Sequence, residues 1–194
     1  MSRLEPLILA SASPRRRELL ELLDLPFTVV PSRAPEPPFA GGDPAAYASA
    51  LALAKAREVA ARLDRGVVIG ADTVVTLGGR VFGKPRDDAD AAAMLAALSG
   101  RTHQVITGLA LVTAPAGAEE SLSVVTKVQF RELTPERIAR YVATGEPSDK
   151  AGAYAIQGRA AAWVTALSGD YFNVVGLPVA TLAELLERRG YPVL

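Results

Sequence analysis

Residues 67–85 read VVIGADTVVTLGGRVFGKP, an apolar run interrupted by one carboxylate. The segment Val67–Val75 predicts a buried strand, and the Gly78-Gly79 pair predicts a hairpin turn into a short return strand. Asp72 lies inside the apolar segment, where burial of a charged group is costly unless the group is paired or binds a metal. Lys84 follows at the end of the hairpin. We therefore expect a functional site at Asp72, with Lys84 as a candidate partner.

Apolar segments and helix caps on either side of this hairpin predict the fold class. With 194 residues, the chain has the length of one large domain or two small lobes. Further apolar runs predict strands at residues 7–10, 27–31, 104–114, 122–130 and 163–167. Helical patterns, most of them with a capping Ser, Thr or Asp, lie at residues 14–24, 44–63, 88–100, 135–145 and 178–189, and residues 168–178 are expected to form a connector. This alternation predicts an α/β protein with a mixed, twisted sheet and flanking helices.

The composition narrows the classes of function. The formal net charge is zero, so we expect neither nucleic acid nor a membrane surface as a partner. The chain has no cysteine and one histidine, which argues against disulfides, thiolate chemistry and histidine-based metal sites. A catalytic metal would be a hard, oxygen-bound ion, Mg²⁺ or Mn²⁺. No apolar run has the length of a signal-peptide core or a membrane span, so we expect a cytoplasmic protein.

His103 is the one histidine, and it precedes a predicted strand. An imidazole with an ordinary pKa serves as a general base in many enzymes. At the start of a strand, a structural hydrogen bond is the interpretation that we favour. A role as catalytic base is the alternative.

Three arginines follow the predicted cap of the first helix. Ser13 is the expected N-cap and Pro14 the first helical residue. Arg15, Arg16 and Arg17 then occupy the first turn, where the helix dipole favours acidic residues. A bound anion would reverse this penalty, because free N–H groups and guanidinium groups would converge on it. Successive helical residues point about 100° apart, so we select Arg15 and Arg16 as the pair that faces one ligand; a solvated arginine cluster is the alternative.

Other polar residues complete a set of groups suited to phosphate chemistry. A Pro- and Gly-rich loop at residues 32–43 carries Glu36, and a segment of small residues ends at Gln157. Each is also compatible with an ordinary loop. P-loop and Rossmann glycine signatures do not occur in the sequence. Basic groups that neutralise phosphates, carboxylates that hold Mg²⁺ and one carboxylate that orients or deprotonates water suit the hydrolysis of a phosphoanhydride.

Six ordered motifs carry a resemblance that extends over nearly the whole chain. They are LILASASPRRRELL (7–20), GADTVV (70–75), GKP (83–85), LSGRTHQVITG (98–108), DKAGAYAIQG (149–158) and VVGLP (174–178). With them the chain resembles the Maf-type nucleoside triphosphate pyrophosphatases. The resemblance implies cleavage between the α- and β-phosphates of a nucleotide, a divalent metal and commonly a homodimer. It also implies one domain over residues 1–194, with two lobes around a deep cleft as in inosine triphosphate pyrophosphatases.

The resemblance assigns roles to individual residues. Asp72 matches the family's proposed proton acceptor, and we take Asp72 and Lys84 as the catalytic residues. The positions that bind phosphate match Ser11, Arg15, Arg16 and Lys55. Three positions that track the nucleobase are Arg15, Thr73 and Gln157, a set that resembles the branch cleaving dTTP, UTP and modified pyrimidine nucleotides. Gln157 can both donate and accept toward a uracil-type edge.

The chain departs from the family pattern at the expected metal site. Close relatives carry an acidic pair after the second strand, whereas this chain has Ser32-Arg33-Ala34-Pro35-Glu36. The usual first acid falls on Pro35, which leaves Glu36. We expect either that Glu36 alone serves the metal in place of the acidic pair, or that Asp72 and the substrate phosphates contribute more of the metal's ligands.

Two alternatives to this function stay open. The chain is also compatible with a nucleotide-binding regulator of cell division that performs no hydrolysis. A 7-methyl-GTP pyrophosphatase is the second alternative, although that branch usually carries Trp, Gln and Glu at the three base-tracking positions. A local geometric expectation also follows. Neighbouring strand residues point to opposite faces, so Asp72 and Thr73 can contact one nucleotide only if the strand ends or bends there.

Overall fold

The computed structural model describes residues 4–193, and the chain divides into two compact units. Unit 1 comprises the described residues up to Asp72, Thr107–Val124 and those from Gly176 onward. Unit 2 comprises Thr73–Ile106 and Val125–Val175.

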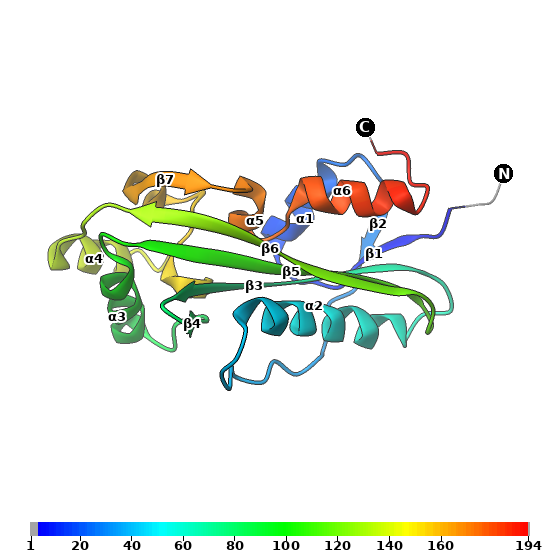
Figure 1. The fold of residues 1–194 in the computed structure, drawn as a ribbon, viewed down its shortest axis with the longest axis horizontal. Coiled ribbons are helices and arrows are strands. Elements are labelled where there is room, and N and C mark those ends of the chain that lie inside the picture. The colour runs from blue at the N-terminus through cyan, green and yellow to red at the C-terminus, as the bar shows by residue number, and fades with distance from the viewer. Residues whose placement is uncertain (1–3, 194) are drawn as a thin grey trace. The chain divides into compact units, whose positions relative to one another are not determined.

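Within residues 4–193 the strands form a seven-stranded sheet (Figure 1). They are β1 (Leu7–Leu9), β2 (Phe27–Val29), β3 (Gly66–Leu77), β4 (Arg80–Phe82), β5 (Thr102–Ala114), β6 (Glu119–Phe130) and β7 (Val164–Ser168). The order is β2-β1-β3-β5-β6-β7, and β4 pairs with β3. β1 is parallel to β2 and β3, whereas β3–β4 and β6–β7 are antiparallel. The predicted α/β fold with a mixed sheet is confirmed, and the cleft stays a prediction.

The helices lie close to their predicted positions. They are α1 (Pro14–Glu21), α2 (Pro44–Ala60), α3 (Asp88–Leu98), α4 (Pro135–Val142), α5 (Tyr171–Val175) and α6 (Val179–Arg188), with short 3₁₀ helices η1 (Ala151–Ala153) and η2 (Arg159–Trp163). Helix α5 lies where we expected a connector. Asp170 Oδ1 accepts hydrogen bonds from Phe172 N at 2.7 Å and Asn173 N at 3.2 Å, a cap on a helix too short for periodicity to reveal. No helix within residues 4–193 has the length and apolar character needed to span a membrane.

The hairpin at the end of β3 agrees with its prediction. Gly78 and Gly79 have φ values of +59° and +80°, which match the type I′ turn that joins two strands with a right-handed twist. Val75 pairs with Phe82 across the hairpin. The upstream part of β3 is buried without interruption from Gly66 to Asp72, so the predicted burial of the carboxylate is confirmed.

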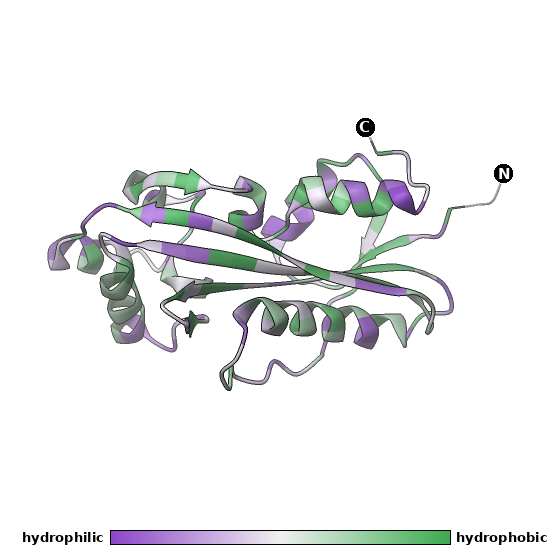
Figure 2. Cartoon of the chain, viewed as in Figure 1, coloured by the Kyte–Doolittle hydropathy of each residue, from purple (hydrophilic) through white to green (hydrophobic). Residues whose placement is uncertain are grey.

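In unit 1, helix α2 covers one face of the sheet, and α1 and α6 lie on the other (Figure 1). Figure 2 shows mostly hydrophobic residues along β1 and β3, and alternating hydrophilic and hydrophobic residues along α6. Two strand glycines let α2 approach closely. A Cβ on Gly70 would lie 2.2 Å from Ala52 O, and one on Gly108 would lie 2.1 Å from Ala48 O. The backbone of α2 therefore packs directly on β3 and β5.

In unit 2, α3 packs on α4 and η1, and aromatic rings form much of the core. These rings meet edge to face, and they belong to His103, Phe130, Tyr141, Tyr154 and Trp163. Such edge-to-face packing is the arrangement that aromatic quadrupoles favour. The cluster makes this part of unit 2 a well-defined support for the loops around it.

Candidate functional site

The turn between β1 and α1 holds Arg16 in a defined position. Ser13 is the N-cap of α1, as predicted, and its Oγ accepts from Arg16 N at 3.5 Å. Ser11 is buried, and its Oγ accepts from Ser13 N at 3.2 Å and from Arg16 Nη1 at 3.3 Å. Arg16 Nε also donates to Gly176 O at 2.9 Å. Ser11 and Arg16 are therefore joined by hydrogen bonds at the N-terminus of the helix.

The three arginines of the first turn differ in their surroundings. Arg15 and Arg16 are half-buried, whereas Arg17 is exposed and pairs with Glu21 at 2.9 Å. This pair has the i, i+4 spacing of an ordinary surface ion pair, which contributes little stability. Arg15 and Arg16 are therefore less exposed than Arg17, and their role as the pair that faces a ligand stays a prediction.

Lys55 of α2 bridges two carboxylates. Its Nζ lies 2.6 Å from Asp72 Oδ1 and 2.6 Å from Glu36 Oε1. The side chains of Lys55 and Asp72 are 12% and 11% exposed, whereas that of Glu36 is 56% exposed. The charge that we expected on β3 therefore has a partner. It is Lys55, which the resemblance placed among the phosphate-binding residues, and not Lys84, the partner that we expected from the linear order.

The contact between α2 and the sheet explains this pairing. Gly70 of β3 lies against Ala52 and Ala56 of α2. Strand side chains alternate between faces, so Asp72 lies on the same face as Gly70. Lys55 precedes Ala56 on the helix that covers this face, and its long side chain reaches the carboxylate. The absence of a side chain at Gly70 thus positions an ion pair two residues farther along the strand.

The charges of this cluster act on Arg16. Burial lowers the pKa of the Arg16 guanidinium, and the neighbouring Arg15 lowers it further. The carboxylates of Asp72 and Glu36 oppose both effects and raise the pKa of Arg16. Arg15, Glu36 and Asp72 therefore lie within electrostatic range of Arg16 in unit 1.

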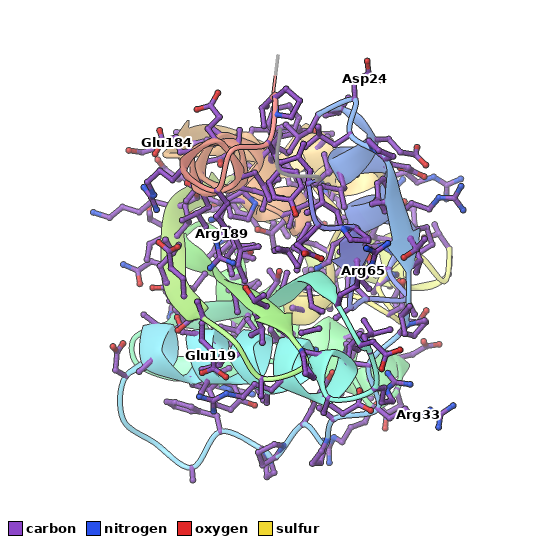
Figure 3. All side chains as sticks on the ribbon, turned by 90° about the vertical axis from the view of Figure 1, so that its right-hand side faces the viewer. Asp24, Arg33, Arg65, Glu119, Glu184 and Arg189 are labelled. Atoms are coloured by element: carbon purple, nitrogen blue, oxygen red, sulfur yellow. The ribbon has the colours of Figure 1, made fainter. Side chains whose placement is uncertain are left out.

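The loop that carries Glu36 is attached to α2 at two points. Near its start, Ser32 Oγ and Arg33 N donate to Glu58 Oε2 at 3.0 and 2.9 Å. Just after Glu36, Pro37 O accepts from Tyr47 OH at 2.8 Å. The Arg33 side chain itself points away from the rest of unit 1 (Figure 3). Arg33 therefore lies on the outside of the loop.

Tyr47 is a candidate site residue that we did not select from the sequence. Burial, Asp72 and Glu36 all raise the pKa of its hydroxyl. Its ring also packs edge to face on Phe39, with centroids 5.2 Å apart. The sequence spacing could have indicated Tyr47. Tyr47, Leu51 and Lys55 follow one another at intervals of four residues, so they lie on one face of the helix.

The donor set of this cluster fits one class of metal. Among residues 4–193, no three His, Cys, Asp or Glu side chains form a group that would hold an ion by themselves. Asp72 and Glu36 converge on one ammonium group, so two carboxylates are available at one point. Mg²⁺ characteristically binds one or two carboxylates and completes its octahedron with water and substrate phosphates. The cluster therefore fits a hard cation that arrives with a phosphate ligand.

The remaining predicted residues belong to unit 2. Lys84 is exposed after β4, and Gln157 is exposed in the turn Ala155–Gly158. Thr73 is half-buried directly after Asp72, and β3 continues through both residues to Leu77. The strand therefore does not end at this pair, and a bend stays a prediction. The roles of all three residues likewise stay predictions.

His103 is buried in the aromatic cluster of unit 2. Its Nε2 lies 2.9 Å from Tyr154 OH, and its ring meets Phe130 edge to face. Burial lowers the pKa of His103 to about 4, although a backbone hydrogen bond with Arg101 raises it in part. A neutral, 1% exposed imidazole with a tyrosine partner agrees with the structural interpretation rather than with a general base.

Comparisons with known proteins agree with the motifs. The family model described as Maf-like protein matches residues 6–189. The dTTP/UTP pyrophosphatase of Moorella thermoacetica is 60% identical over 187 residues, which cover 96% of each chain. Proteins of the same name from Symbiobacterium thermophilum and Myxococcus xanthus are 50% and 52% identical; the matches cover 98% and 96% of this chain and 97% and 94% of the relatives. The chain therefore belongs to the Maf-like protein family.

Proposed function

We propose that the chain hydrolyses dTTP and UTP between the α- and β-phosphates and releases the nucleoside monophosphate and pyrophosphate. Relatives that are 60% and 50% identical over nearly the whole chain bear the name dTTP/UTP pyrophosphatase. The observation that carries the proposal is the ammonium group of Lys55, which bridges Asp72 and Glu36 in the unit that also contains the α1 N-terminus. Fixed cations next to carboxylates provide what phosphoanhydride hydrolysis requires.

In the proposed reaction, some residues of unit 1 bind the phosphates and Asp72 transfers the proton. The first-turn N–H groups of α1, with Ser11, Arg15 and Arg16, bind phosphate oxygens. Lys55 adds a further positive charge and holds the Asp72 carboxylate in place through its 2.6 Å contact. An ionised carboxylate accepts hydrogen bonds without donating them, so Asp72 orients the attacking water and takes its proton.

We propose Mg²⁺ or Mn²⁺ as the cofactor, held by Asp72 and Glu36. The bound ion would neutralise phosphate charge and polarise a phosphoryl oxygen. Glu36 is the loop carboxylate available for this role, because Pro35 occupies the position of the usual first acid. The bond from Tyr47 OH to Pro37 O supports the loop next to this carboxylate.

The proposal also covers recognition of the nucleobase, the role of Lys84 and the organisation of the chain. Arg15, Thr73 and Gln157 select a pyrimidine, and Lys84 assists Asp72 in catalysis. The two units act as lobes of one domain, since β3, β5 and β6 each contribute residues to both. A homodimer and a cytoplasmic location stay predictions.

A substrate panel tests the function directly. Purified protein is incubated with dTTP, UTP, dCTP, GTP and 7-methyl-GTP, with Mg²⁺, with Mn²⁺ and with excess EDTA, and pyrophosphate release is measured. We expect release from dTTP and UTP with either metal and none in EDTA. Binding of dTTP without release would favour the nucleotide-binding regulator, and a preference for 7-methyl-GTP would favour the other branch of the family.

A further inference from the structure

The exposed Gln157 lies at the tip of a tight turn in unit 2. Gly158 N donates to Ala155 O at 3.0 Å, which closes the turn around Ile156 and Gln157. Ile156 is buried and fixes one side of the turn in the core, whereas Gln157 is exposed. The position of the Gln157 amide therefore depends on what holds the two ends of this turn.

Two side chains from outside the turn hold both of its ends. At the first end, Ala155 N donates to Tyr141 Oη at 3.1 Å. At the second end, Arg159 N donates to Glu146 Oε1 at 3.0 Å and to Oε2 at 3.3 Å. Tyr141 OH donates to Glu146 Oε1 at 2.8 Å, so the two anchors are also joined to each other.

The packing at Gly158 is a separate sign that the carboxylate belongs at this turn. A Cβ on Gly158 would lie 2.1 Å from Glu146 Oε1 and 2.5 Å from Glu146 Cδ. Any side chain at this position would therefore displace the Glu146 carboxylate. The glycine leaves room for the Glu146 carboxylate.

The two anchors are themselves supported. Tyr141 is 4% exposed, and its ring packs on Trp163 with centroids 4.6 Å apart. Burial raises the pKa of the Tyr141 hydroxyl, which keeps it protonated and able to donate to Glu146. Glu146 N donates to Thr144 Oγ1 at 3.2 Å, and Glu146 O accepts from Lys150 Nζ at 3.0 Å.

We infer that Tyr141 and Glu146 are positioning residues that fix the Gln157 amide for recognition of a pyrimidine base. The inference rests on the proposed function, in which Gln157 contacts the base. Neither anchor touches the nucleotide; both act through the turn. Their effect is therefore confined to the base-dependent part of binding.

A double-mutant cycle on nucleotide affinity tests this inference. The dissociation constants of dTTP and of inorganic triphosphate, which lacks a base, are measured by calorimetry for wild type, Glu146→Ala, Gln157→Ala and the double variant. We expect each single change to weaken dTTP binding about tenfold, and the double change to add less than about twofold, because residues acting through one contact are not additive. Triphosphate affinity should stay within about twofold, since no base is read.

Two further variants separate positioning from folding. Glu146→Gln keeps an oxygen acceptor for Arg159 N and should recover dTTP affinity to within about threefold of wild type. Glu132→Ala, at an exposed glutamate of unit 2 outside this network, should leave both affinities unchanged. Thermal unfolding midpoints are recorded for every variant.

Each outcome has a defined meaning. Additive losses of about 100-fold for dTTP in the double variant would show that Glu146 acts independently of Gln157, and equal losses for dTTP and triphosphate would show a general structural role. Either result overturns the inference. If wild type binds dTTP without releasing pyrophosphate, the proposed function fails, and the affinity cycle still decides the positioning role. If wild type does not bind dTTP, the inference fails with it.

Discussion

The carboxylate of Asp72 lies among buried apolar residues of β3 and accepts a hydrogen bond from Lys55 Nζ at 2.6 Å. In the proposed reaction this carboxylate takes the proton of the attacking water. An amide has the same shape but cannot serve as that base. Replacement of Asp72 by asparagine therefore tests the charge of the side chain while its shape is kept.

We expect Asp72→Asn to lower pyrophosphate release from dTTP by about 100- to 10,000-fold, the range that general base catalysis contributes. The amide oxygen still accepts from Lys55, so the thermal unfolding midpoint should change by only a few degrees. Asp64→Asn, at an exposed aspartate of unit 1, is the matched control and should retain wild-type turnover. Turnover of Asp72→Asn close to that of the control would exclude the catalytic role.

His103 makes a second residue-scale prediction, in the pH dependence of stability. Its pKa in the folded protein is about 4, below the ordinary value of 6.5, so the unfolded chain binds more protons between these values. Stability from this residue is therefore complete above pH 6.5 and is lost as the pH falls toward 4. We expect a loss of about 2 kcal/mol in the free energy of unfolding between pH 7 and pH 5 from this group.

Urea denaturation at pH 7 and pH 5 checks this value. His103→Gln lacks the titrating group, so its free energy of unfolding should fall less than that of wild type over the same range. The difference between the two proteins isolates His103, because it is the one histidine of the chain. Equal losses in both proteins would contradict the burial of a neutral imidazole.

At the scale of the element, the position of helix α2 depends on two strand residues, Gly70 and Gly108, that have no side chain. A Cβ on Gly70 would meet Ala52 O at 2.2 Å, and one on Gly108 would meet Ala48 O at 2.1 Å. Both contacts are to helix backbone, which cannot rotate away as a side chain does. Lys55 belongs to this helix, so its distance to Asp72 depends on the same contact.

We expect Gly70→Ala and Gly108→Ala each to lower the free energy of unfolding by about 1–3 kcal/mol or more, the cost of overpacking a dense core. Displacement of α2 should also lower pyrophosphate release, because Lys55 moves with the helix. Gly83→Ala is the stability control, since a Cβ there meets nothing within 4 Å. Urea denaturation of the three variants gives the comparison, and a cost for Gly70→Ala no larger than for Gly83→Ala would contradict this packing.

At the scale of the whole molecule, three strands connect the two units. β3, β5 and β6 each begin in one unit and end in the other. Because the same three strands belong to both units, we expect the units to unfold together as one domain. Trp163 is the one tryptophan and lies in unit 2, whereas far-ultraviolet circular dichroism reports on helices of both units.

We expect tryptophan fluorescence and circular dichroism to follow one urea transition with the same midpoint. Coincident transitions are the standard sign of a single cooperative domain. A circular dichroism curve with two steps, one of which matches the fluorescence, would show two independent domains. The Trp163→Phe variant has no tryptophan fluorescence, and its circular dichroism transition shows whether loss of the indole ring changes the midpoint.

Local features of the chain predict much of this fold. The Gly78-Gly79 hairpin, the Ser13 cap and the buried position of Asp72 each follow from a few neighbouring residues, and the structure has all three. The residues that determine a tight turn, a helix cap or a buried strand segment are close neighbours in the sequence. A short stretch of sequence is therefore enough to predict each of these features. Helix α5 escaped prediction because five residues carry too little pattern.

The partners of these local features depend on packing between distant segments. Asp72 required a partner, and the linear order suggested Lys84, but the partner that the structure shows is Lys55, brought to β3 by the contact of α2 with Gly70. In the same way, Glu146 reaches the turn of Gln157 because Gly158 leaves space for it. Hydrophobic periodicity states which face of an element is buried and not which surface it meets. The sequence by itself therefore determines that β3 carries a buried carboxylate. The tertiary packing of α2 on β3 determines which lysine forms the ion pair with it.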